Sequence, residues 1–256
     1  MATLSLPQVS RSVNGFILYD GPSQLGAGRI LAIATGFARK SSNEKTGDMI
    51  QVWIIPADAK AHQAYTAGLD VAVCGDCKHR SRASGGAGTC YVNVAQGPSA
   101  VWQAWRNGAY LPINDYRIFA DRAVRFGAYG DPCAVPINVW VSILINTDQW
   151  TSYTHQWRDS RFEQYREFCM ASVDNRAEFY EARSQGWRTF RVRTASEQVE
   201  PREFICPASE EGGYRKSCID CQACNGAGNN PSRGSVTIVV HGAKGKIASF
   251  NRNTQA

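Results

Sequence analysis

Short runs of apolar residues alternate with polar stretches along most of the chain. Near the beginning, three of these runs are typical of β-strands: Phe16–Tyr19, Arg29–Thr35 and Met49–Ile55. The polar stretch at residues 39–47 favours a hairpin loop between the last two runs. The pattern therefore predicts a small antiparallel β element over residues 1–57.

From about residue 58 onward, strand-like and helix-like patterns alternate. Helices are expected at residues 58–67, 98–107, 120–126, 135–145 and 175–185, and strands at residues 70–73, 89–94, 151–154, 168–173, 187–193, 203–206 and 236–240. This alternation is typical of βα units. We therefore expect an α/β fold with a partly parallel sheet, open or barrel-like, in a metal-binding domain at residues 58–256 on which the N-terminal element packs.

The composition is that of a globular protein, because 43% of the 256 residues are hydrophobic and only 20% are charged. The apolar runs fall short of the ~18 residues that a membrane-spanning helix needs, and the first residues lack the pattern of a secretory signal. We therefore expect no contact with a membrane and a cytoplasmic location. The net charge of +6 is spread along the chain, so it allows a nucleic-acid partner without marking a binding patch.

The chain has nine cysteines, and most of them are clustered. In a reducing cytosol, clustered cysteines are typical of metal sites or catalytic thiols rather than disulfides. Cys218, Cys221 and Cys224 form a C-x2-C-x2-C run, and Cys206 can supply a fourth ligand. This spacing matches iron–sulfur proteins better than a single tetrahedral zinc, although a four-cysteine zinc site remains the alternative. Cys169 lies in an apolar run, and we expect it in the core.

A second group of cysteines comes earlier in the chain. Cys74, Cys77 and Cys90 form a C-x2-C-x12-C pattern, and His79 follows the second cysteine by two residues. Three sulfur ligands and one nitrogen ligand would complete a closed zinc site. Cys133 can instead supply the fourth ligand. The alternative to a metal site is that Cys74 and Cys90 are simply buried strand residues.

Several ligand-type residues follow the expected strands: Cys74, His155, Asp174, Cys206 and His241. In parallel α/β sheets, ligands bind beyond the carboxyl ends of the strands. The pattern therefore predicts one shared site, with His155, Asp174 and His241 as candidate catalytic residues. Asp174 can alternatively serve only as the cap of the helix that follows.

A set of short motifs carries a resemblance to a known group of proteins. The motifs are CGDCKHR, GTCYVN, GAYGDPCAVP, YTHQW, CMASVDN, GWRTFRVR, ICPASEEGG and CIDCQACNG. Together they resemble uncharacterised cysteine-rich proteins of tailed bacteriophages over most of residues 14–242. The resemblance implies a phage-encoded protein in the host-cell cytoplasm and no particular activity. The residues at the strand ends are also similar in outline to radical-SAM barrels, but the chain lacks the C-x3-C-x2-C run of that family.

Two functional hypotheses follow. The first is an iron–sulfur enzyme, or one with both iron–sulfur and zinc, in nucleotide or nucleic-acid metabolism. The second is a non-catalytic protein that zinc stabilises and that binds nucleic acid or a host protein.

Overall fold

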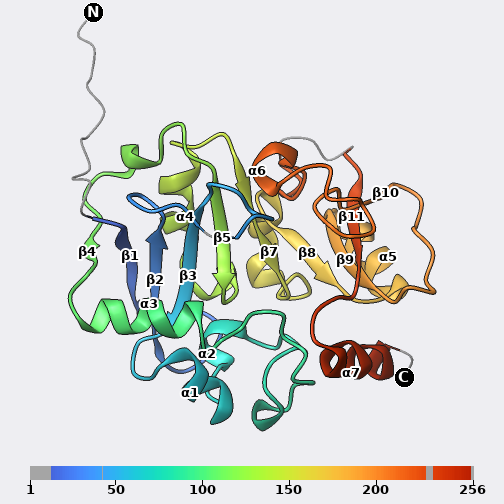
Figure 1. Cartoon of the computed structure of the whole chain (residues 1–256), viewed down its shortest axis with the longest axis horizontal. Helices are drawn as coiled ribbons and strands as arrows, with labels where there is room; N and C mark the ends of the chain where they lie inside the picture. Colours follow the sequence, from blue (N-terminus) through green and yellow to red (C-terminus); the bar gives the residue numbers. More distant parts are fainter. Residues whose placement is uncertain (1–12, 42, 229–232, 255–256) are drawn as a thin grey trace, which may run out of the picture.

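The computed structural model describes residues 13–41, 43–228 and 233–254 (Figure 1). The strands in this part of the chain are β1 (Gly15–Pro22), β2 (Arg29–Thr35), β3 (Ile50–Pro56), β4 (Leu111–Pro112), β5 (Val124–Tyr129), β6 (Trp150–Thr151), β7 (Tyr153–Thr154), β8 (Met170–Val173), β9 (Thr189–Arg193), β10 (Glu203–Ile205) and β11 (Ser235–Val239). They form a mixed six-stranded sheet in the order β4-β1-β2-β3-β5-β6 and a five-stranded sheet in the order β10-β11-β9-β8-β7.

Parallel pairing runs through both sheets. β1, β2 and β3 pair with one another as antiparallel neighbours, and β3 then pairs with β5 in parallel. Every pairing in the five-stranded sheet is parallel. Only Ser152 separates β6 from β7 along the chain, so the two sheets meet at this residue. The prediction of an α/β fold with a partly parallel sheet is therefore confirmed.

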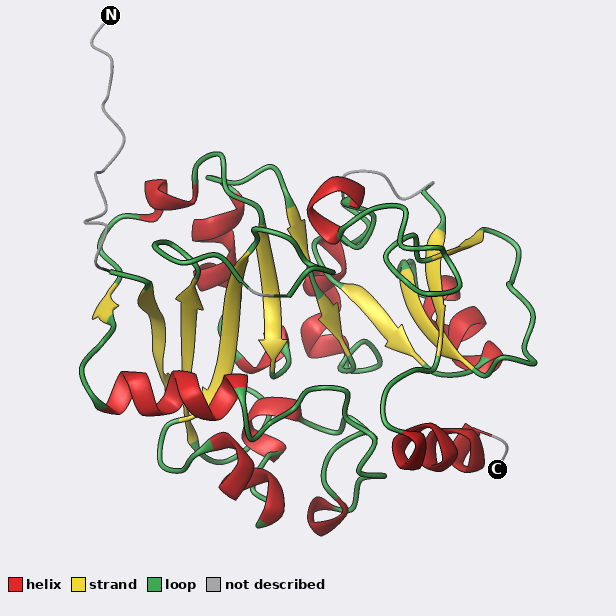
Figure 2. Ribbon diagram, viewed as in Figure 1, coloured by secondary structure: helices red, strands yellow, loops and turns green. Residues whose placement is uncertain are grey.

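Helices lie around both sheets and at both ends of the parallel strands. The α-helices are α1 (Ala61–Thr66), α2 (Val71–Cys74), α3 (Gly97–Arg106), α4 (Ile137–Leu144), α5 (Arg176–Ser184), α6 (Cys218–Cys221) and α7 (Lys244–Thr254), with short 3-10 helices at residues 82–84, 116–119, 132–134 and 160–167. The carboxyl ends of the parallel strands point toward the side of the molecule that carries α1, α2 and α7, whereas α6 lies at the opposite side (Figure 2).

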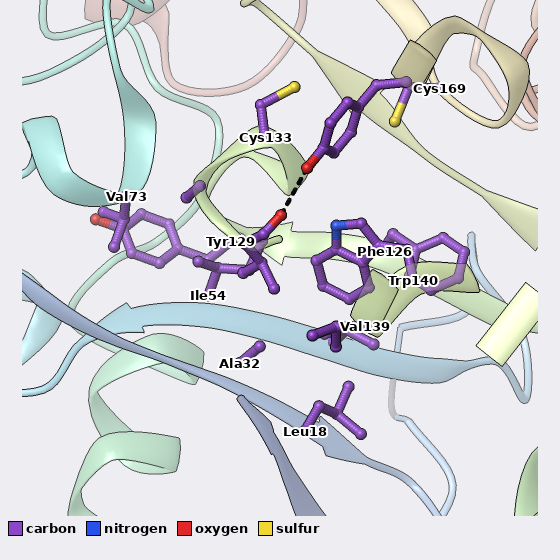
Figure 3. Packing of buried hydrophobic residues seen from close by; sticks show 14 of the residues in the cluster. Leu18, Ala32, Ile54, Val73, Phe126, Tyr129, Cys133, Val139, Trp140 and Cys169 are labelled. Carbon is purple, nitrogen blue, oxygen red and sulfur yellow. Dashed lines mark hydrogen bonds between the residues drawn. The ribbon is translucent and has the colours of Figure 1, made fainter. Parts of the chain in front are cut away.

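Two hydrophobic clusters form the core. The centre of the larger one packs around Phe126 and Trp140 (Figure 3). This cluster extends from β2 and β3 to Phe179 and Ala182 on α5. The smaller cluster uses the alternate side chains of the five-stranded sheet, such as Val192 and Ile238, together with Cys206 and Cys224. Since side chains alternate along a strand, β8 contributes to both clusters: Ala171 and Val173 belong to the larger one, and Met170 belongs to the smaller one.

Some local predictions were wrong where an apolar run was short. Residues 70–73, expected as a strand, begin the single helical turn of α2, and residues 89–94 form no strand. Residues 120–126, expected as a helix, lead into β5, in which Val124 and Phe126 are buried as alternate strand residues. Short apolar runs fit either a strand or a helix, so tertiary packing decides their structure. The proposed boundary between residues 57 and 58 stays a prediction.

We expect Trp140→Ala to destabilise the protein by about 3–5 kcal/mol, the range found for truncating large buried aromatics. Trp140 is fully buried, packs edge-on against Phe126 at 5.2 Å between ring centroids, and donates from its indole nitrogen to the Pro132 carbonyl at 3.0 Å. Urea unfolding measures the change. Val141→Ala, at an exposed position of the same helix, is the control and should change stability by no more than about 0.5 kcal/mol; equal effects would contradict this packing.

Candidate metal centre

Three side chains from distant parts of the sequence meet beyond the carboxyl ends of β7 and β8. His155 follows β7, Asp174 follows β8, and His79 comes from the loop between α2 and α3. One ligand atom of each lies within 4.8 Å of those of the other two. Among the described residues, this is the one group of three or more His, Cys, Asp or Glu side chains with that spacing. Two imidazoles and a carboxylate form a common ligand set for transition metals.

The His79 ring is held by a partner on each nitrogen. Its Nε2 lies 2.9 Å from Oδ2 of Asp174, and its Nδ1 lies 2.6 Å from Oγ1 of Thr89. The ring also stacks on Phe250, with 6.1 Å between centroids, and contacts His155 edge-on. Metal-binding histidines usually have such a hydrogen bond on the nitrogen that does not face the metal. Thr89 is therefore placed to orient His79 as a ligand.

His155 is positioned through its backbone by a buried carboxylate. Its amide nitrogen donates to Oδ2 of Asp131 at 2.8 Å, while the other Asp131 oxygen accepts from the Thr154 hydroxyl, also at 2.8 Å. Asp131 follows β5 and Thr154 ends β7, so the ends of one strand from each sheet fix this part of the site. Burial, with the neighbouring His79, lowers the pKa of His155 to about 3. The ring is therefore neutral at physiological pH and has a lone pair available for a metal.

Asp174 supplies a buried negative charge. Burial opposes its ionisation, but the hydrogen bond from His79 and the charge of Lys78 outweigh that cost and hold the pKa of Asp174 well below its usual range. Lys78 Nζ lies 2.9 Å from Oδ2 of Asp174 and is also paired with Glu178. Asp174 does not cap α5, because the side chain that accepts from the helix amide is that of Asn175. Its carboxylate is therefore not used as a helix cap and is available as a metal ligand.

A cavity of about 350 Å³ opens beside this group. It is lined by Lys78, His79, Gly85, Gly86, Ala87, Thr89, Asp174 and Phe250. A second hollow of about 590 Å³ lies next to it, bounded by the same glycine-rich loop and by α7. Volumes of this size suit a small ligand, so a metal held by the three side chains would face a space that a substrate can enter.

Cys74, Cys77 and Cys90, called here the Cys74 set, lie close to this centre but do not join it. Cys74 ends α2 rather than a strand. Burial raises the pKa of all three thiols, and the negative charge of Asp70 raises the pKa of Cys74 and Cys90 further. The His79 nitrogens face Asp174 and Thr89 instead of these thiols, so the predicted site of three sulfurs and one His79 nitrogen is not preformed.

Cys133 and Cys169 lie in the main hydrophobic core (Figure 3). The Cys133 sulfur is 3.2 Å from the Thr154 hydroxyl, and the Cys169 sulfur is 2.8 Å from the Ser152 hydroxyl. Both side chains are fully buried. The expectation that Cys169 is a core residue is confirmed. Cys133, named as an alternative fourth ligand, is not part of any group of ligand atoms within 4.8 Å of one another.

The second predicted set, Cys206, Cys218, Cys221 and Cys224, is called here the Cys206 set. Its side chains share the smaller hydrophobic cluster. All nine cysteines lie in the described part of the chain, and none belongs to a group of three or more ligand atoms within 4.8 Å of one another. No cysteine cluster is therefore preformed with the spacing of the His79, His155 and Asp174 group.

His241, the third catalytic candidate, lies just beyond the end of β11. Its ring contacts that of Tyr91, with 5.1 Å between centroids, and burial, with the nearby Lys45, lowers the pKa of His241. It is not one of the three clustered ligands. The expected shared site thus brings together two of the predicted strand-end residues, His155 and Asp174, and adds His79.

We expect Thr89→Val to weaken metal binding by about 10- to 100-fold, the range found when partners of metal-binding histidines are removed. Valine keeps the shape but leaves Nδ1 of His79 without its hydrogen bond, so the ring loses its fixed orientation. Titration calorimetry of the metal-free protein measures the change. Thr66→Val, on the exposed face of α1, should bind metal as the wild type does; unchanged affinity in Thr89→Val would contradict the role given to Thr89.

Comparison with known proteins yields no match: no family model fits the chain, and neither a curated protein nor a solved structure is significantly similar to it. No helix among the described residues is long and apolar enough to cross a membrane.

Proposed function

We propose that the protein is a metal-dependent enzyme whose centre is one divalent transition-metal ion held by His79, His155 and Asp174. The observation that carries this proposal is the mutual approach of their three ligand atoms to within 4.8 Å. Three protein ligands leave at least one coordination position open, as in catalytic rather than structural sites. The open position would face the 350 Å³ cavity, where a metal can polarise a substrate oxygen or activate water.

The ligand set favours zinc or ferrous iron. Two neutral imidazoles and one carboxylate suit both ions, and the same set with open positions is used by non-haem iron oxygenases. In the metal-free site the His79 ring lies against Asp174. A metal on Nε2 would take the place of the proton between them, and that proton would move to Nδ1 of His79, where the Thr89 hydroxyl oxygen can accept it. Lys78, which also pairs with Glu178, can stay beside the carboxylate and face the substrate.

A metal-free use of the same residues is the nearest alternative. Asp174 and His79 form a hydrogen-bonded pair, and such a pair can act in general acid–base chemistry without a metal. His155 distinguishes the two schemes, because its ring makes no hydrogen bond within the described residues but has an atom within 4.8 Å of the other two ligands. A metal site needs the His155 ring, whereas the pair does not.

Metal titration of chelator-treated protein tests the proposal. The wild type should take up one Zn²⁺ or Fe²⁺ per chain at this site, and His155→Ala should lose that ion. His62→Ala, which removes a histidine on α1, should retain it. The proposal would be contradicted if the wild type bound neither ion, or if His155→Ala bound as much metal as the wild type. Either result would favour the acid–base pair.

The basic side chains near the site support a substrate that carries a phosphate. Arg82 and Lys246 line the neighbouring 590 Å³ hollow together with Tyr65, and none of the described residues that line it carries a carboxylate. Arginine and lysine are the usual partners of phosphate, and a tyrosine ring offers a stacking surface for a base. This agrees with the hypothesis of nucleotide or nucleic-acid metabolism. Thermal stabilisation by a nucleoside monophosphate, lost in Arg82→Ala, would test it.

The remaining hypotheses from the sequence stay proposals. They are a phage origin with action in the host-cell cytoplasm, an iron–sulfur or zinc cofactor on the cysteines, and the alternative of a zinc-stabilised protein that binds nucleic acid or a host protein. Anaerobic purification separates the two kinds of cofactor, because an iron–sulfur protein is coloured and contains sulfide, whereas a zinc protein is colourless.

A further inference from the structure

The four cysteines of the Cys206 set are brought together by segments that are anchored separately. The backbone nitrogen of Cys206 donates to the Thr237 carbonyl on β11, and that of Cys218 donates to the Lys45 carbonyl, each at 2.8 Å. The Cys224 carbonyl accepts from the amide of Ser152, between β6 and β7, at 3.0 Å. The sheet and the loop at residues 43–47 thus hold both ends of the C-x2-C-x2-C segment beside Cys206.

A buried cation lies under this segment. The guanidinium of Arg188 is only 1% exposed and makes no ion pair with a carboxylate in the described residues. It donates to four neutral oxygens, from Ala223, Asn225, Gly226 and Gly234, at 2.6 to 3.1 Å. Burial lowers the pKa of Arg188 to about 10, which leaves it charged at neutral pH. A buried charge without a counter-charge is costly, so an anion is expected nearby.

The closest candidate anions are the thiols of the Cys206 set. A negative charge on Cys224 would raise the pKa of Arg188 and so stabilise its charged form. The positive charges of Arg233 and Arg183 act in the opposite sense. Burial, followed by the neighbouring thiols of the set, raises the pKa of Cys206 and Cys218, whereas the charge of Lys45 acts to lower it.

Arg125 adds a further positive charge close to Cys218. Its Nε atom is buried and has no hydrogen-bond partner in the described part of the chain. Arg125 also forms no ion pair with any carboxylate described there. The cysteine cluster therefore faces cations on several sides.

The surroundings of Cys74 and Cys77 are the opposite, whereas the cation Lys246 acts on Cys90 of the same set. There, the carboxylates of Asp70 and Asp131 act on Cys74, and those of Asp131 and Asp174 act on Cys77. Negative neighbours disfavour thiolates and suit neutral thiols or a bound cation. The two cysteine sets therefore have different electrostatic roles, although their sequence spacings look alike.

We infer that Cys206, Cys218, Cys221 and Cys224 bind a thiophilic metal centre, zinc or an iron–sulfur cluster, as thiolates. Four thiolates give such a centre a net negative charge, which Arg188, Arg125 and Lys45 would balance. The thiol protons leave to solvent as the metal binds, and no oxidation is involved in that step. α6, which carries two of the ligands, lies at the opposite end of the strands from α2 and α7 (Figure 1). This centre is thus separate from the His79, His155 and Asp174 site.

Binding would require a local movement. No three of the four sulfur atoms lie within 4.8 Å of one another, so the segment must draw closer to Cys206 around a metal centre. α6 is a single turn that ends at Gln222 in the left-handed conformation, and loops flank it on both sides. Cys218 and Cys221 are only partly buried. A short helix between loops can shift without disturbing the sheet beneath it.

Anaerobically purified protein should contain zinc, or iron with acid-labile sulfide, bound by these thiols. Cys221→Ser should lose that metal, and Cys90→Ser, from the Cys74 set, should keep it. Zinc without sulfide identifies a single-ion site, and iron with sulfide identifies a cluster. Equal metal content in both variants and the wild type would overturn the inference.

If Cys221→Ser fails to fold, a cobalt titration of the wild-type protein tests the same inference without that variant. Thiolate ligands give cobalt intense charge-transfer absorption, which imidazole and carboxylate ligands do not. We expect this absorption in the wild type and in Asp174→Asn, so that the result is independent of the proposed enzyme site. We also expect metal to protect Cys218 and Cys221 from iodoacetamide. Absence of the absorption, or equal alkylation with and without metal, would overturn the inference.

Discussion

Replacing Asp174 by asparagine is expected to weaken binding of the divalent ion by about 100-fold or more, beyond the 10- to 100-fold seen when only supporting partners are removed. The change keeps the shape of the side chain but removes the single negative charge of the ligand set. Asp174 is almost fully buried, so water cannot replace that charge without cost. Titration calorimetry with Zn²⁺ on chelator-treated protein measures the effect.

The matched control for Asp174→Asn is Glu181→Gln, which makes the same chemical change at an exposed carboxylate that pairs with Arg158. The control should bind metal like the wild type. Unfolding in urea must show that Asp174→Asn remains folded, because Asp174 also accepts from His79 and Lys78. A folded Asp174→Asn variant with the affinity of the wild type would show that the ion does not bind at this carboxylate.

Replacing Arg188 by methionine should destabilise the protein by about 3 kcal/mol or more, because it leaves several buried oxygens without donors at roughly 1–3 kcal/mol each. The affected oxygens belong to residues 223, 225, 226 and 234, which surround the Cys206 set. We therefore also expect the variant to lose the metal bound by these thiols. Urea unfolding and metal analysis of the same sample measure both effects.

The control for Arg188→Met is Arg161→Met, at an exposed arginine that pairs with Asp159. It should change stability by no more than about 0.5–1 kcal/mol, as is usual for exposed ion pairs. Arg188→Met would contradict the role of the buried cation if it unfolded at the same urea concentration as the control. If Arg188→Met is less stable but keeps the thiol-bound metal, Arg188 stabilises the fold and its charge is not needed for metal binding.

The fold class could be predicted from the sequence because strand-like and helix-like runs alternate over most of the chain. Longer patterns were reliable: the helix expected at residues 175–185 is α5, and the strand expected at residues 187–193 contains β9. Runs of a few residues were not, as α2 shows. The helix α7 was not predicted, because its polar sequence has a weak apolar pattern and it is anchored by Phe250, which stacks on His79.

The candidate site could be predicted only in part. His155 and Asp174 were recognised because they follow strands, and parallel strands place their ends together. His79 was recognised as a ligand, but it was grouped with the nearby cysteines because sequence spacing was the only guide. Its approach to Asp174, 95 residues away, depends on how the loop between α2 and α3 crosses the strand ends. Nothing in the local pattern indicated Thr89 as its partner.

The buried charges were also beyond what the sequence could show. Arg188 lies in the strand expected at residues 187–193, and nothing in the local pattern indicates that its guanidinium is buried. Its burial beneath the Cys206 set comes from Ala223, Gly226 and Gly234, whose carbonyl oxygens surround the guanidinium. Asp131 is similar, since its role depends on the meeting of β5 with β7. Long-range loop paths, rather than element types, decide both positions.

The most direct test of the central claim is an anomalous difference map from crystals of the protein loaded with zinc. We predict a strong peak within bonding distance of His79 Nε2, a ring nitrogen of His155 and a carboxylate oxygen of Asp174. A second peak at the Cys206 set would not affect this claim. A fully loaded crystal with no peak among His79, His155 and Asp174 would contradict it.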